Sequence, residues 1–366
     1  MKKILLLLVA LLALTGLHAQ TSTTNHIEAG DVTLMPGDDE TQYMPLVLVG
    51  STKYSAYNLD VEIPEGVEVA LDEGDLDVYF DNTTIIPFKK GVPQHQLSAT
   101  YHEIDRTLRI SCISTSLAEF TNTSGILCYV GLKTDSYTKP GTLSTQLTGQ
   151  NLTTKEGVKN VPADATYNNI TIGTTGYVGL TVSATNKWST CILPFATALP
   201  EGVKAYTCST KNDEEQLFYL TEVTTLEAYT PYILYSEEGY TGTLTGTIDA
   251  SQYPESGVVT QGYLKGAVQQ QTTSEGYVLQ NKGEGVKFYL TDPTKIYTIP
   301  AGKCWASVPT STIDSYDFAF APSLVGRVSE NGTTTTKGAC YGVNGIQMVT
   351  PAGGTLYIQD GRKYVK

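Results

Sequence analysis

Six cysteines are the residues of this 366-residue chain with the widest chemical possibilities, and their spacing limits what they can do. No two of them are spaced Cys-x-x-Cys, so the sequence predicts neither a redox-active dithiol nor a zinc knuckle. Cys191 and Cys208 lie on either side of a Pro-Glu-Gly turn, each among apolar residues. No histidine lies near them in sequence to lower a thiol pKa, so we expect this pair to be structural, as a disulfide or as packed free thiols.

A second pair, Cys112 and Cys128, lies in two segments in which apolar and polar residues alternate. If these segments form a hairpin centred on Phe120, the two cysteines stand opposite each other on its buried side, within reach of a disulfide. Two buried free thiols are the alternative. We therefore predict four structural cysteines, Cys112, Cys128, Cys191 and Cys208, and no catalytic residue.

The other side chains that could bind a metal or transfer protons follow no recognised pattern. His26, His95 and His102 lack metal-binding spacing, and we expect them to be solvated surface residues. The acidic run from Asp72 to Asp81 lacks the residue order of a calcium-binding loop, so we expect it to be a solvated loop, and calcium binding through its oxygen atoms is the alternative. We predict no metal site and no cofactor.

Trp305 is the residue that we expect to contact a ligand. In the segment GKCWASV, strand alternation places Cys304 and Ala306 on one face, which we expect to be core. Trp305 then shares the opposite face with Lys303. An outward tryptophan can stack on a sugar ring or on a partner's side chain, and a tryptophan covered by a neighbouring loop is the alternative.

The first residues of the chain predict export from the cytoplasm. Two lysines precede an apolar run from Ile4 to Leu14, and small residues follow as far as Ala19. This pattern is that of a secretory signal peptide over residues 1–19, and the apolar run is too short to span a bilayer. We therefore expect a secreted protein, in the extracellular space or on the outer cell surface, without a membrane-spanning segment.

The charge of the chain excludes one class of partner. Cleavage after Ala19 removes two of the 24 basic residues, so 22 remain against 37 acidic residues and the net charge is about −15. Such a chain repels nucleic-acid phosphates, so we predict no nucleic-acid partner. The 24 tyrosines and the abundant threonine, glycine and valine favour strands and turns over helices.

The chain divides into three regions that together predict an all-β protein. Residues 25–173 and 178–325 each contain short alternating segments separated by Gly, Pro, Asn and Asp, which is typical of β-sandwiches and barrels. The segment GTTGY at residues 173–177 resembles a linker between two domains. Residues 326–366 begin as a polar, flexible connection and end in a C-terminal hairpin, in which Asp360 and Gly361 form the turn.

Several segments resemble a known family. AYNLDVEIPEGVEV, LRISCIST, GILCYVGLKT and KPGTLSTQLTGQNLTT resemble strands of the cohesin-like β-sandwich of secreted Bacteroidetes-type surface proteins and cellulosome scaffolds. ILPFATALPEGVKAY and IPAGKCWASVP are similar to a β domain that follows it in such proteins, which we expect to be a second sandwich or a barrel. The final GGTLYIQDGRKYVK resembles the last hairpin of C-terminal sorting tails.

This resemblance implies a non-catalytic recognition protein of the adhesion or scaffold type, with an extracellular protein as its partner. Cohesins bind dockerins through one sheet face, but no residue of that interface can be placed in this chain. A carbohydrate-binding module that assists extracellular polysaccharide use, with a glycan as partner, is the first alternative. A glycoside hydrolase with two facing carboxylates is the second, because paired acids leave no fixed spacing in a sequence.

Overall fold

The computed structural model describes residues 25–283 and 285–320, together with the backbone of four short strands between residues 340 and 365. The residues up to Ala319 form one compact unit, and Phe320–Lys366 form a second. The described elements are β-strands apart from one 3-10 helix, η2 (Ala250–Gln252), so the predicted all-β fold is confirmed. Among these residues, no helix is long and apolar enough to cross a membrane. The expected signal peptide lies outside the described residues.

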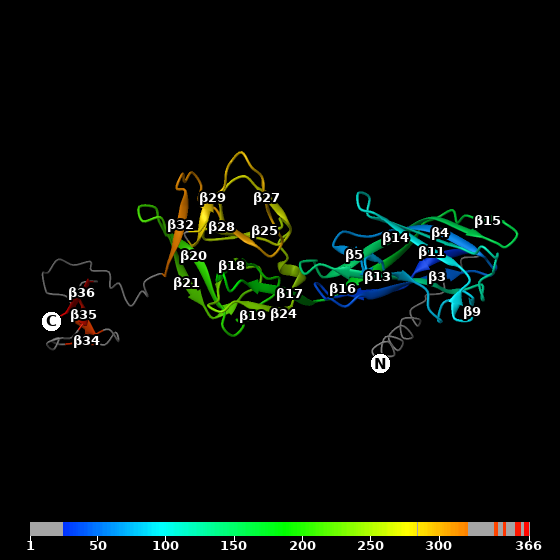
Figure 1. Cartoon of the computed structure of the whole chain (residues 1–366), viewed down its shortest axis with the longest axis horizontal. Coiled ribbons are helices and arrows are strands. Elements are labelled where there is room, and N and C mark those ends of the chain that lie inside the picture. The colour runs from blue at the N-terminus through cyan, green and yellow to red at the C-terminus, as the bar shows by residue number, and fades with distance from the viewer. Residues whose placement is uncertain are drawn as a thin grey trace. The chain divides into compact units, whose positions relative to one another are not determined.

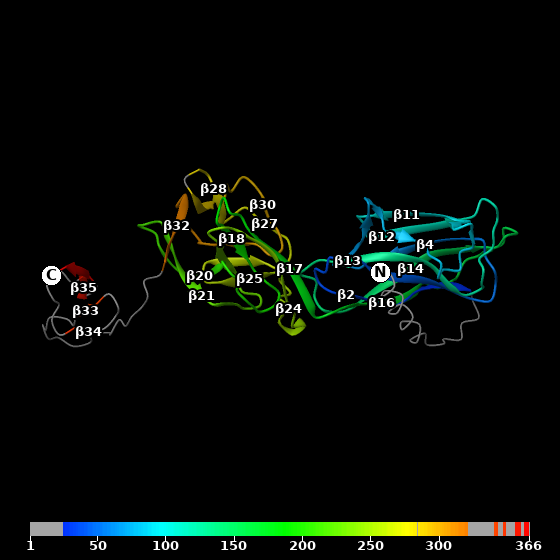
Figure 2. The same ribbon diagram turned by 60° about the horizontal axis from the view of Figure 1, so that its bottom comes forward.

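Two sheets pack face to face in residues 25–173 (Figures 1 and 2). The first has five strands in the order β1-β3-β13-β5, with β8 paired to β13. Their bounds are β1 His26–Ala29, β3 Gln42–Val49, β13 Gly125–Thr134, β5 Val67–Val69 and β8 Val78–Tyr79. Two small hairpins accompany the sheets: β6 (Leu71–Asp72) with β7 (Asp75–Leu76), and β9 (Phe88–Lys89) with β10 (Val92–Pro93).

The second sheet has seven strands in the order β11-β12-β4-β14-β16-β2, with β15 paired to β14. Their bounds are β11 Gln96–His102, β12 Thr107–Ile113, β4 Ala56–Glu62, β14 Gly141–Thr153, β16 Thr166–Ile172, β2 Val32–Leu34 and β15 Lys159–Asn160. All of these pairs are antiparallel except β16 with β2. We call this seven-stranded sheet the wide sheet.

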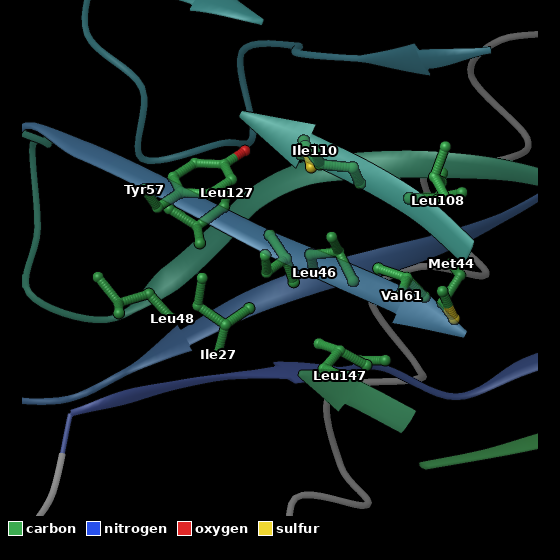
Figure 3. Packing of buried hydrophobic residues seen from close by; sticks show 14 of the residues in the cluster. Ile27, Met44, Leu46, Leu48, Tyr57, Val61, Leu108, Ile110, Leu127 and Leu147 are labelled. Carbon is green, nitrogen blue, oxygen red and sulfur yellow. The ribbon is translucent and has the colours of Figure 1, made fainter. Parts of the chain in front are cut away.

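Alternation along the strands builds the core between the two sheets. In β4, Tyr57, Leu59 and Val61 are buried, whereas Asn58, Asp60 and Glu62 point outward. Buried side chains of both sheets fill this core, among them Leu46 and Leu48 of β3 and Val61 and Ile110 of the wide sheet (Figure 3). Each fully buried Leu, Ile or Val side chain contributes about 1.5–3 kcal/mol, so this core stabilises the sandwich.

Three Pro-x-Gly segments lie among the residues that the structure describes, and each forms a turn of the same geometry. The backbone N–H of the residue after the glycine donates to the carbonyl oxygen of the proline: Val67 to Pro64, Val203 to Pro200 and Lys303 to Pro300, at 3.1–3.2 Å. The glycine in between has a positive φ of 82°, 77° and 82° in the three turns. This is the φ that the third position of a type II turn requires, so the repeated motif in the sequence is a repeated turn.

The second region contains a ten-stranded sheet in the order β18-β23-β20-β21-β32-β29-β28-β31-β26-β25. Their bounds are β18 Trp188–Cys191, β23 Tyr232–Tyr235, β20 Lys204–Asn212, β21 Leu217–Val223, β32 Ser315–Phe320, β29 Val286–Leu290, β28 Tyr277–Asn281, β31 Cys304–Ala306, β26 Leu264–Ala267 and β25 Val258–Gln261. The sheet curls back on itself. The backbone N–H of Cys304 in β31 donates to the Thr190 hydroxyl in β18 at 3.0 Å, although these two strands are far apart in the strand order. We call it the curled sheet.

Three strand pairs border the curled sheet: β17 (Thr175–Val182) with β24 (Tyr240–Thr247), β19 (Thr197–Ala198) with β22 (Thr225–Leu226), and β27 (Gln271–Thr273) with β30 (Tyr297–Ile299). In the second compact unit, β34 (Gln347–Met348), β33 (Cys340–Gly342), β35 (Leu356–Gln359) and β36 (Arg362–Val365) form a four-stranded sheet in that order. Its last two strands pair Leu356 with Val365, which confirms the expected C-terminal hairpin. The expected flexible connection lies outside the described residues.

The expected linker at residues 173–177 is shorter than predicted. β16 ends at Ile172 and β17 already begins at Thr175. Tyr137, from the loop after β13, is buried in the next hydrophobic cluster along the chain, where its hydroxyl donates to the carbonyl oxygen of Ile192 at 2.9 Å. The division into domains at residues 25–173 and 178–325 stays a prediction.

Candidate functional site

The five described cysteines are buried free thiols. Burial is the largest cause of the raised pKa of these thiols. It raises the pKa of Cys128, Cys191 and Cys208 to about 12. A thiol with so high a pKa holds almost no thiolate at neutral pH, so it is a poor nucleophile. Of the two alternatives that the sequence left open, the structure has packed thiols, and the structural role of the cysteines stays a prediction.

The expected hairpin that places Cys112 opposite Cys128 is wrong. Cys112 lies in β12 of the wide sheet and pairs with Leu97 and Tyr57, whereas Cys128 lies in β13 of the five-stranded sheet and pairs with Leu46. The chain between them crosses from one sheet to the other, so the two thiols approach each other across the core. The Tyr57 hydroxyl lies with them, where burial and then the two thiols raise its pKa.

Cys191 and Cys208 also lie in different clusters. Cys191 packs with the residues around Leu193 and Phe195, as expected, but its neighbouring thiol is Cys304, whose Sγ donates to the Cys191 carbonyl oxygen at 3.0 Å. Cys208 packs inside the curled sheet instead. The turn between the two strands therefore does not bring these two side chains together.

The expectation that Trp305 points outward is wrong, although its alternation is right. Cys304 and Ala306 pack in two core clusters on one face of β31. The Trp305 ring points the other way, but there it packs against Ala267 and Ile299 and is only 6% exposed. Both faces of this strand are covered, so the ring offers no stacking face in this structure. A ligand-binding role for Trp305 stays an untested prediction.

Two of the three histidines and one residue of the acidic run are buried, although we expected them to be solvated. His26 and His95 are buried rather than solvated, and the Nε2 of His95 lies 3.1 Å from the carbonyl oxygen of Ser55. Burial lowers the pKa of His95, so the ring is neutral at pH 7. In the acidic run, Asp77 accepts a hydrogen bond from the Tyr43 hydroxyl at 3.0 Å. The described residues hold no group of three or more metal-binding side chains that could coordinate an ion.

The outward face of the wide sheet is the surface that combines the most features of a binding site. An open depression of about 520 Å³ lies over β12, β4 and β14. Its lining is mostly polar and includes Asn58, Asp60, Arg109, Ser111, Ile113, Asn151 and Lys159. The residues that alternate with them along β4 and β12 point inward and are buried in the core, so these side chains point outward.

An ion pair with two parallel hydrogen bonds lines this depression. Asp60 and Arg109 are direct cross-strand neighbours, and the Arg109 Nε and one terminal nitrogen donate to the two carboxylate oxygens at 2.8 and 2.9 Å. The hydrogen bond from Arg109 is the largest cause that lowers the pKa of Asp60. Both groups are fixed by this fork, so they present a defined polar pattern to a partner.

Two large exposed side chains lie on the same face. Ile113 ends β12 at the rim of the depression and is 52% exposed. Tyr167 on β16 is 69% exposed, and its hydroxyl accepts a hydrogen bond at 2.9 Å from the side-chain amide of Gln146, its cross-strand neighbour. We call the outward positions of β12, β4, β14 and β16 the wide-sheet face.

Sequence reasoning did not single out these residues. Asn58 and Asp60 lie on the outward side of their strand, but nothing in the sequence set them apart from other outward positions. The signal that was available is Tyr167 in TYNNITI, a large aromatic residue at the outward position of an alternating strand.

Comparison with known proteins adds a structural likeness. No protein-family model matches the chain, and no curated protein matches it. A non-cellulosomal cohesin from Archaeoglobus fulgidus matches 41% of this chain and 91% of its own length, with 16% identity and a TM-score of 0.30. A type I cohesin, solved in a cohesin–dockerin complex from Clostridium thermocellum, matches 41% of this chain and 99% of its own length, with 16% identity and a TM-score of 0.32. A type II cohesin domain from the cellulosome of Acetivibrio cellulolyticus matches 41% and 95%, with 13% identity and a TM-score of 0.31.

Proposed function

We propose that this chain is a secreted, non-catalytic recognition protein that binds an extracellular protein partner through the wide-sheet face. The observation that carries the proposal is the combination on that face of exposed Ile113 and Tyr167 with the fixed Asp60–Arg109 pair. Protein interfaces are enriched in tyrosine and arginine, and their hot spots join such anchors to well-placed polar groups.

The shape of the surface supports a macromolecular partner over a small ligand. The depression is open and lies on a sheet, where side chains stand side by side on neighbouring strands. A small ligand needs an enclosed pocket to bury most of its surface. A protein partner can instead cover the depression and reach Tyr167, two strands away from β4.

Two further observations support export and a non-catalytic role. The N-terminal pattern of two lysines, an apolar run and small residues favours a signal peptide. The described thiols are buried with raised pKa values, which disfavours nucleophilic chemistry at the cysteines.

The proposal is tested by capturing the partner with matched surface variants. Immobilised protein is incubated with the envelope and culture-medium proteins of the producing cells, and the retained proteins are identified by mass spectrometry. We expect Tyr167→Ala and Ile113→Ala to weaken the binding of a captured partner by about 1–2 kcal/mol each, roughly tenfold, because exposed anchors lose their contacts.

Leu71→Ala is the matched control, because Leu71 is also a large exposed aliphatic residue but lies on β6, away from the wide-sheet face. It should leave the affinity unchanged. A partner whose affinity is the same for wild type, Tyr167→Ala and Ile113→Ala would contradict the proposed face. Hydrolysis of polysaccharides by the purified protein would contradict the non-catalytic role.

A further inference from the structure

The curled sheet brings together aromatic residues that are far apart in its strand order. Trp188 lies in β18 and Phe318 in β32, four strands along the sheet. Neighbouring strands are about 4.8 Å apart, so the two rings would be separated by roughly 19 Å on a flat sheet. Their centroids are 4.8 Å apart. The two side chains therefore meet on the concave side of the curl.

Four rings from four strands meet at this point. Besides Phe318, Trp188 contacts its cross-strand neighbour Tyr235 at 4.8 Å and Tyr206 at 6.1 Å between centroids. Tyr206 is buried, whereas Trp188, Tyr235 and Phe318 are only partly buried at the border of the aromatic core inside the curl. We call Trp188, Tyr206, Tyr235 and Phe318 the aromatic corner.

Polar side chains border the aromatic corner at the same strand ends. Lys187, directly before Trp188, pairs with Glu237, which also accepts a hydrogen bond from the Tyr235 hydroxyl. The Asn281 amide, at the end of β28, donates to the side-chain oxygen of Asn186 at 3.0 Å. Hydrogen-bond donors and acceptors thus lie beside the aromatic surface. Lys187 and Glu237 together carry no net charge.

We propose that the aromatic corner is a carbohydrate-binding subsite that stacks a neutral pyranose ring of an extracellular glycan on Trp188. The negative face of an aromatic ring attracts the C–H groups on one side of a sugar, while the sugar hydroxyls require a mixed set of donors and acceptors at its edge. Glu237 and Lys187 supply that set. This function is additional to protein recognition, because it uses a different sheet from the wide-sheet face.

The two tryptophans of the chain make the binding directly observable. Trp305 is buried, so sugar binding at the corner should change mainly the fluorescence of Trp188. Cellohexaose, xylohexaose, mannohexaose and chitohexaose are titrated separately at millimolar concentrations. We expect at least one of them to shift the emission and to protect it from acrylamide quenching, with the affinity measured by calorimetry.

Variants of the corner and its border decide the assignment. Trp188→Ala should weaken the sugar affinity at least about tenfold, as loss of an aromatic anchor does, while Trp188→Phe should retain part of it. If Trp188→Ala lowers the melting temperature too far to be used, the exposed Glu237→Ala serves instead and should weaken binding without loss of the fold. Tyr167→Ala, on the wide-sheet face, should bind sugar as the wild type does.

The proposal is overturned if none of the four oligosaccharides changes the fluorescence or produces heat of binding. It is equally overturned if sugar binds with the same affinity to folded Trp188→Ala or Glu237→Ala protein. Capture of a protein partner that Trp188→Ala abolishes, without any sugar binding, assigns the corner to protein recognition and also overturns it. None of these results bears on Tyr167 and Ile113, so the two proposed sites fail or hold separately.

Discussion

At the scale of single residues, the two tryptophans differ in burial. Trp305 lies in an alternating strand and points away from the main core, but a further layer formed with Ile299 of β30 covers it. Trp188 begins its strand next to the polar residues Asn186 and Lys187, and it is only partly buried. The contrast arises because exposure is decided by what covers a face, not by which way the side chain points.

The burial of Trp305 leads to a stability prediction. Trp305→Ala should lower the free energy of unfolding by about 3–5 kcal/mol, because the removed ring leaves a cavity among Ala267 and Ile299. Trp305→Phe should lose less, since a smaller ring still fills part of the space. Urea denaturation followed by far-UV circular dichroism measures both losses. A stability of Trp305→Ala equal to that of the wild type would show an exposed ring and return this residue to the ligand-binding candidates.

At the scale of elements, the β11–β12 hairpin carries two arginines with different tasks. Arg106 is the last residue of the hairpin turn, with a φ of 52°, and its guanidinium donates to the carbonyl oxygens of Ile63, Pro64 and Val67. It therefore fixes the Pro-x-Gly turn that connects β4 with β5. Arg109, three residues later, points outward and pairs with Asp60. One arginine holds a turn and the other belongs to a surface.

These different surroundings predict different costs for the same substitution. Arg106→Lys should destabilise the protein by about 1–3 kcal/mol, because a lysine cannot serve three carbonyl oxygens in fixed directions and leaves some of them unsatisfied. Arg109→Lys is the matched control and should cost less than about 1 kcal/mol, as exposed ion pairs do. Chemical denaturation of the two variants in parallel makes the comparison. Equal losses would contradict the role assigned to Arg106.

At the scale of the whole molecule, the hydrophobic residues form separate clusters along the chain. One cluster draws its members from Ile27 to Ile172, and three smaller ones draw theirs, apart from Tyr137, from Val178 onward. Tyr137 is the described residue of the first region that belongs to a cluster of the second. The first region therefore contains almost all of its own core, which supports the proposed division into two domains.

A fragment of residues 25–174 tests this division. We expect it to fold alone and to unfold in one cooperative transition in urea, because its core cluster is complete within these residues. The measurement is circular dichroism together with tyrosine fluorescence, since both tryptophans lie outside the fragment. The full chain, unfolded under the same conditions, is the reference. A broad transition without a folded baseline would argue against an independent first domain.

The sequence by itself determined the features that depend on neighbours along the chain. Alternation in GKCWASV placed Cys304 and Ala306 on a core face, and the Pro-Glu-Gly between Cys191 and Cys208 indicated a turn that the structure contains. The Asp-Gly pair near the C-terminus set the register of the last hairpin. These predictions succeeded because a period of two residues and a positive φ are local properties of the backbone.

Only the tertiary structure decided which strands pair and what covers each face. Cys112 and Cys128 were expected side by side, but the chain between them crosses to the other sheet, and a bulge in β13 buries both Leu127 and Cys128. The curl that joins Trp188 to Phe318 likewise depends on strands far apart in sequence. Pairing, curling and covering are settled by the burial of apolar surface over the whole fold, and a local pattern is compatible with several such arrangements.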